Sequence, residues 1–233
     1  ADRLGIGYET LKERNPGIVY GSINCFGQEG PWDMRPGFEQ NAQAATGIQL
    51  RNAGVSDIST FGTSRPRPAT FTLNDYGTGI SAAFAVMLAL LERKKTGLGQ
   101  RVEAALSYTS ALLTGPYHVD YEGFQRDDIG GPGARGTGAL NRLYECSDGW
   151  LLLSVSGNIE LNALKSTPYF SEIPESPSCD DLQPIFREKS TAEWETILTK
   201  AGVPVVRNTS ADELHADPSN RKRHLVCSRD YRS

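Results

Sequence analysis

Apolar residues are unevenly spaced along residues 1–70, and their spacing predicts short elements separated by loops. Residues 8–14 predict a short helix, because the polar stop NPG follows them directly. The stretch 18–26, IVYGSINCF, is β-branched and aromatic between turn signals and predicts a buried strand. A loop rich in glycine and proline follows at 27–37, and a short helix is expected at 38–47. Residues 48–70 show no period and are expected to be irregular.

The longest regular pattern, 72–96, predicts one long helix. Its middle is apolar on every face, which is typical of a helix packed inside a sizeable domain. Asn74 or Asp75 could cap its start, and Gly97 follows three basic residues at its end.

After the long helix, the sequence predicts a strand at 101–106 and a helix at about 107–122. The stretch 142–156 predicts a hairpin, and 190–202 an amphipathic helix that opens with a Ser/Thr–x–x–Glu capping box. Residues 157–185 between them are rich in proline and serine. Strands alternating with helices indicate the α/β class.

The predicted elements suggest two domains. The glycine-rich stretch 126–141 is expected to link a first domain, residues 1–125, to a small α+β domain at 142–233.

Composition excludes several classes of function. A net charge of −4 argues against nucleic acid as a partner. The longest apolar run, 80–91, is too short to cross a bilayer, and the first residues do not resemble a signal peptide. Four cysteines and three histidines are scattered without metal-ligand spacing, so no metal site is expected. Unpaired cysteines would fit a reducing cytoplasm, with disulfide bridges among the four as the alternative.

Several stretches in order together resemble class III CoA-transferases, the family of formyl-CoA transferase, carnitine CoA-transferase and alpha-methylacyl-CoA racemase. They are RLGIGYETLKERNPGIVYGSINCFGQEGP (3–31), RPGFEQNAQAATG (35–47), DYGTGISAAFAVMLALLERKKTGLGQRVEAAL (75–106), YECSDGW (144–150) and parts of 190–218. The resemblance implies part of a Rossmann-like large domain plus a smaller domain, in a family of interlocked dimers. It also implies a partial chain, because the usual N-terminal segment and the closing segment have no counterpart.

The family's chemistry depends on an aspartate carboxylate that attacks an acyl-CoA thioester and then carries CoA itself. Aligning GQRVEAALSY (99–108) with the family pattern places that aspartate at Tyr108. A phenol offers no acyl carbon to carry CoA, although it could donate a hydrogen bond or move a proton. Glu103 is not expected to replace the aspartate, because an odd offset along a strand faces the opposite side of the sheet. A buried core tyrosine is the structural alternative.

Other positions match the family less specifically. Glu39 matches an acidic position that helps to place the carboxylate substrate, with a solvated carboxylate at a helix start as the alternative. The glycines of 130–138 fall where the family has a lid over the acyl site, with an ordinary linker as the alternative. Arg35, Arg65 and Arg67 could meet CoA phosphates, with solvation at the surface as the alternative. The candidate CoA-binding residues are Gly130, Gly131, Gly133, Arg35 and Arg65.

Three functions remain open. The first is transfer of CoA between an acyl-CoA thioester and a small carboxylic acid, with CoA as substrate and no metal. The second is a non-catalytic subunit in a homodimer or in a heteromer with an active homologous chain. The third is altered acyl-CoA chemistry in which Tyr108 handles a proton; racemisation is disfavoured because no histidine lies at 38–45. His118, expected about three helical turns beyond Tyr108 on roughly the same side, is interpreted as structural.

Overall fold

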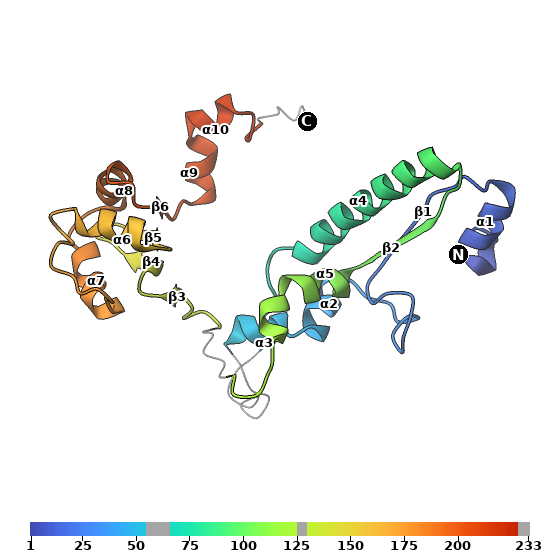
Figure 1. Ribbon diagram of the computed structural model, residues 1–233, viewed down its shortest axis with the longest axis horizontal. Coiled ribbons are helices and arrows are strands. Elements are labelled where there is room, and N and C mark those ends of the chain that lie inside the picture. The colour runs from blue at the N-terminus through green and yellow to red at the C-terminus, as the bar shows by residue number, and fades with distance from the viewer. Residues whose placement is uncertain (55–65, 125–129, 228–233) are drawn as a thin grey trace, which may run out of the picture. The chain divides into compact units, whose positions relative to one another are not determined.

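The computed structural model describes residues 1–54, 66–124 and 130–227 and separates the chain into two compact units, Ala1–Ala134 and Arg135–Ser233 (Figure 1). The division lies inside the stretch 126–141 that was expected to link two domains. No helix among the described residues is long and apolar enough to cross a membrane.

The first unit is built around two parallel strands and the helix that connects them. Its elements are η1 (Asp2–Leu4), α1 (Tyr8–Arg14), β1 (Tyr20–Asn24), α2 (Glu39–Ala45), α3 (Ile48–Ala53), α4 (Leu73–Thr96), β2 (Arg101–Ala105), α5 (Leu106–Leu113) and η3 (Gly115–His118). The strands pair in register from Tyr20↔Arg101 to Asn24↔Ala105, so their carboxyl ends lie side by side. Helix α4 packs along both strands (Figure 1).

Glycine permits the close approach at the start of the two strands. The Gly99 amide donates to the Pro16 carbonyl at 2.8 Å, and the Tyr20 amide donates to the Gln100 carbonyl at 3.0 Å. A Cβ at Gly99 would collide with the backbone of Gly17 and Ile18. Only glycine therefore fits between the end of α4 and this edge of β1.

Helix α4 packs through one face rather than all round, which corrects the expectation of a helix buried on every side. The residues that it buries are small or polar: Asn74, Thr78, Ala82 and Ala89. Its large apolar side chains are exposed, among them Tyr76, Ile80, Phe84, Met87, Leu88 and Leu91. Two strands are too narrow to cover more than one side of a helix, and small side chains let it approach them closely.

The second unit is an antiparallel sheet covered by helices. The sheet has the order β3 (Gly136–Gly138), β4 (Asn141–Glu145), β5 (Trp150–Ser154) and β6 (Val205–Arg207). The helices are α6 (Asn158–Lys165), α7 (Cys179–Phe186), α8 (Thr191–Lys200), α9 (Ala211–Ala216) and α10 (Pro218–Lys222). The predicted hairpin at 142–156 is confirmed as β4 and β5.

Aromatic side chains form the core of this unit. Trp194 is fully buried against Phe170 and Phe186, and its indole N–H donates to the Phe186 carbonyl at 2.8 Å. The Tyr144 ring stacks on Phe186 with centroids 4.5 Å apart. Burial raises the pKa of the Tyr144 phenol well above its ordinary value, so this ring is a core residue and stays neutral.

Several local predictions need adjustment. The segment expected to be irregular contains α3, and the proline- and serine-rich stretch contains α6 and α7. The helix expected at 107–122 stops at Leu113, and η3 follows it after Thr114. The capping box predicted for 190–202 is confirmed: the Ser190 hydroxyl accepts from the Glu193 amide, and the Glu193 carboxylate accepts from the Ser190 amide.

Candidate active site

The carboxyl ends of β1 and β2 form the natural place for a site in the first unit, because loops and a helix start converge there. Helix α5 begins at Leu106, directly after β2. The Ser107 amide donates to the Cys25 carbonyl at 2.9 Å, which ties the first turn of α5 to the end of β1. Burial, followed by the negative charge of Asp75, raises the pKa of the Cys25 thiol, so it is not an activated nucleophile.

Tyr108 lies in this first turn of α5 and is 52% exposed, so it is not the buried core tyrosine of the structural alternative. Its hydroxyl lies against Gly27, where any Cβ would collide with it. Gly27 has a positive φ of 88°, and its amide donates to Asn24 Oδ1 at 2.5 Å. The tyrosine ring therefore extends to the turn that leaves β1.

Glu103 reaches the same turn from β2. Its Oε1 accepts from the Gln28 amide at 2.6 Å, and its Oε2 lies 3.3 Å from the Arg101 guanidinium. The Gln28 side chain in turn donates to the Ser22 hydroxyl. The Glu103 side chain remains 25% exposed.

Glu103 and Tyr108 therefore contact adjacent residues, Gln28 and Gly27. Glu103 and Tyr108 do not face opposite sides of a sheet, as was expected from their odd offset, because side chains alternate between faces only within a strand. Strand β2 ends at Ala105, and the chain turns into α5 before Tyr108.

Glu39 is a buried carboxylate with three donors rather than a solvated one. It is 5% exposed, and it accepts from Asn74 Nδ2 at 3.0 Å, from the Asp75 amide at 2.8 Å and from Gln43 Nε2 at 2.8 Å. The start of α4 is therefore capped by Glu39 of α2. This corrects the cap expected from Asn74 or Asp75, since neither bonds the helix start through its own side chain and the N-cap, Thr72, makes no side-chain bond.

Hydroxyl contacts fix α5 against its neighbours. Thr109 Oγ1 lies 2.7 Å from Thr78 Oγ1 of α4, and Ser110 Oγ lies 2.5 Å from Thr46 Oγ1 beside α2. His118 Nε2 lies 2.8 Å from Thr114 Oγ1. Because α5 ends at Leu113, His118 is not on the same helix as Tyr108, and its ring bonds a side chain of the connecting turn.

The predicted CoA-binding residues occupy different places in the unit. Gly130 and Gly131 pack against the end of α3, beside Arg51 and Gly54, whereas a Cβ at Gly133 would meet open space.

Arg35 is exposed and stacks on the Trp32 ring at 4.6 Å, and Trp32 packs edge-on against Phe26 at 5.2 Å. Arg65 lies outside the described residues. No group of three histidine, cysteine or acidic side chains suited to a metal ion occurs in the described ranges.

Sequence reasoning missed Asn74, Gly27 and Gln28 as parts of this region. Gly27 carried a signal, since a glycine directly after a strand often marks a close backbone approach. Asn74 bonds Glu39, which is 35 residues away, and Gln28 bonds Glu103, which is 75 residues away. Contacts over such distances leave no local pattern in the sequence.

Residues 1–232 match the family model described as CoA-transferase family III. The chain belongs to this family. It is 27% identical to an acyl-CoA transferase of Fusarium pseudograminearum over 97% of the chain and 51% of that protein. It is 26% identical to the (R)-2-hydroxy-4-methylpentanoate CoA-transferase of Clostridioides difficile over 93% of the chain and 56% of that protein.

Solved structures support the mixed α/β fold of the family. A CAIB/BAIF family protein from Brucella suis matches 95% of this chain and 61% of its own, with a TM-score of 0.70 and 23% identity. The hypothetical protein Rv3272 from Mycobacterium tuberculosis matches 96% of this chain and 62% of its own, with a TM-score of 0.71 and 21% identity. The two curated relatives named above match nearly the whole of this chain, but the chain spans only about half of their length.

Proposed function

We propose that this chain transfers CoA between an acyl-CoA thioester and a small carboxylic acid. The observation that carries the proposal is the cluster at the carboxyl ends of β1 and β2. There, a half-exposed Tyr108 in the first turn of α5 and the partly exposed carboxylate of Glu103 contact the same two-residue turn. The relatives named above act on acyl-CoA or transfer CoA, which supports this substrate class.

Tyr108 takes the position of the family aspartate in this proposal. A phenol cannot form the CoA thioester, so its role is to donate a hydrogen bond beside the reacting carbonyl. Arg35, Arg65 and the glycines Gly130, Gly131 and Gly133 are proposed to hold CoA. The four cysteines are free, which supports a reducing compartment such as the cytoplasm.

The test is transfer itself. The full chain is incubated with succinyl-CoA or acetyl-CoA and a set of short carboxylic acids, and new acyl-CoA is measured by mass spectrometry. The expected result is a new acyl-CoA thioester formed with at least one of the acids. A folded chain that binds CoA and forms no thioester with any acid contradicts the proposal.

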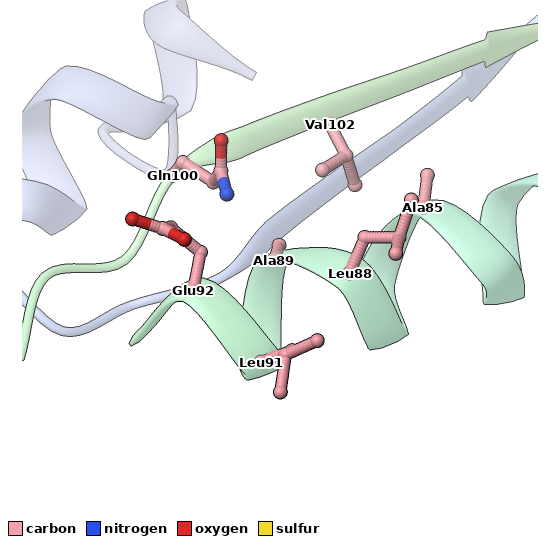
Figure 2. Close-up of a pocket in the computed structure, with 7 residues that line it drawn as sticks. All are labelled: Ala85, Leu88, Ala89, Leu91, Glu92, Gln100 and Val102. Atoms are coloured by element: carbon pink, nitrogen blue, oxygen red, sulfur yellow. The ribbon is translucent and has the colours of Figure 1, made fainter. Parts of the chain in front are cut away.

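A second candidate function is that of a subunit paired with a homologous chain of the same family. The exposed apolar side chains of α4 favour it, because patches of this kind mark interfaces. An open groove of about 470 Å³ lies between α4 and β2, and Figure 2 shows Ala85 and Leu88 on the side of α4 that faces Val102.

The small size of the parallel sheet also favours pairing with a homologous chain. Parallel sheets are normally covered on both faces, yet β1 and β2 form a sheet of two strands among the described residues. The relatives contain about as many residues again as the part that this chain matches. A homologous chain would bring the parallel strands and helices that fit this surface.

Purification of the tagged chain from its own cells tests the pairing. The expected result is a complex with an identified family III chain that survives Glu13→Gln on exposed α1 and is lost on Leu88→Glu. A folded chain that purifies alone and transfers CoA unaided excludes this function and leaves the first.

A further inference from the structure

We propose that Glu103 is the carboxylate that carries the acyl group and then CoA in this chain. This inference rests on the proposed function. It concerns the one chemical requirement that Tyr108 cannot meet, a carboxyl carbon that becomes activated.

The position of Glu103 fits this role. Its carboxylate contacts Gln28, and the Tyr108 hydroxyl contacts Gly27, so both reach the same point at the carboxyl ends of the strands. By contrast, Glu39 is buried, and the three donors that it binds belong to the chain itself. Asp75, in the first turn of α4, is exposed and is a rival carboxylate.

The hydrogen bond from Gln28 gives the carboxylate a defined chemistry. Its amide holds Oε1 at 2.6 Å, so Oε1 is the oxygen that stays a carbonyl when the other oxygen attacks. Charge that develops on Oε1 when a nucleophile later adds to the glutamate carbon is stabilised by this backbone donor. The Arg101 contact at Oε2 is longer and joins partly exposed groups, so it yields to a substrate at little cost.

The reaction balances without a further reagent. Oε2 attacks the thioester carbonyl, the carbon–sulfur bond breaks, and CoA leaves as the thiolate, which gives a mixed anhydride. The thiolate then attacks the glutamate carbon and expels the donor carboxylate, which leaves a glutamyl-CoA thioester. The acceptor carboxylate attacks that thioester and releases the thiolate, and the thiolate attacks the acceptor's acyl carbon and frees Glu103.

Mapping of the covalent intermediate tests the assignment. The full chain is incubated with acetyl-CoA or succinyl-CoA, quenched with hydroxylamine, digested and analysed by mass spectrometry. The expected result is a hydroxamate on Glu103 in the wild-type chain.

Glu103→Gln should lower transfer roughly 10³-fold or more while retaining an acceptor for the Gln28 amide. Glu13→Gln, a change at an exposed carboxylate of α1, is the matched control and should leave transfer unchanged.

Each other outcome has one meaning. A hydroxamate on Asp75 or Glu39 with transfer intact overturns the assignment and leaves the proposed function standing. Full transfer by Glu103→Gln does the same. Absence of both transfer and modification in a folded wild-type chain overturns the proposed function as well. If Glu103→Gln fails to fold, the position of the wild-type adduct still decides.

Discussion

Replacement of Glu39 by alanine is expected to loosen the start of α4 and with it the support of α5. The carboxylate accepts from Asn74 Nδ2, the Asp75 amide and Gln43 Nε2, and the variant leaves these donors without it. A hydrogen bond to a charged group contributes about 1.5–3 kcal/mol, and water entering the space satisfies part of the loss. We therefore expect a loss of about 3 kcal/mol, in line with the cost of leaving buried hydrogen-bond donors without their acceptor.

Hydrogen exchange measured by mass spectrometry reports this loss locally, which is necessary in a chain of two units that need not unfold together. Amides in the first two turns of α4 should exchange roughly 100-fold faster in Glu39→Ala, since each 1.4 kcal/mol is a factor of ten. Residues of the second unit, around Trp194, should keep their protection.

Two comparison variants sharpen the result. Glu39→Gln should lose less, because its amide can donate to Asn74 Oδ1, a buried oxygen without a partner in the structure. Glu13→Ala, on exposed α1, should change protection by less than about 0.5 kcal/mol. Unchanged exchange of the α4 amides in Glu39→Ala would refute the capping role. The role expected from the family resemblance, placement of the carboxylate substrate, would then remain as the hypothesis for Glu39.

Three further predictions concern the second unit. Trp194→Ala should lower its free energy of unfolding by about 3–5 kcal/mol, measured by urea titration, because the ring is fully buried. Ser190→Ala removes the N-cap of α8 and should lower the unfolding free energy of the second unit by about 1 kcal/mol at neutral pH. Hydrogen bonds from Ser190 lower the pKa of Glu193, so the stabilisation that they give is fully present above the ordinary carboxyl pKa. The difference in unfolding free energy between wild type and Ser190→Ala should therefore shrink as the pH falls through the lowered pKa of Glu193. At pH 8, iodoacetamide should modify exposed Cys227 and spare buried Cys146, whose pKa burial raises to about 11; equal labelling in a peptide map would contradict this.

The sequence by itself determined the elements whose causes are local. The capping box of Ser190 and Glu193 joins residues three apart, and the β4–β5 hairpin joins neighbouring stretches, so both could be predicted from their own residues. The short helices α3, α6 and α7 were missed because their patterns are brief and lie among turn-forming residues. The order of the family stretches likewise sufficed to place the chain among CoA-transferases.

The tertiary structure decided which side chains meet. The contact of Glu39 with Asp75 spans 36 residues, and that of Glu103 with Gln28 spans 75, so neither leaves a periodic trace in the sequence. Alternation along a strand predicted that Glu103 and Tyr108 face opposite sides of the sheet. In the structure the turn from β2 into α5 brings both side chains to the end of β1. The apolar composition of α4 predicted burial, but burial depends on what lies opposite each face, and that is a property of the assembled fold.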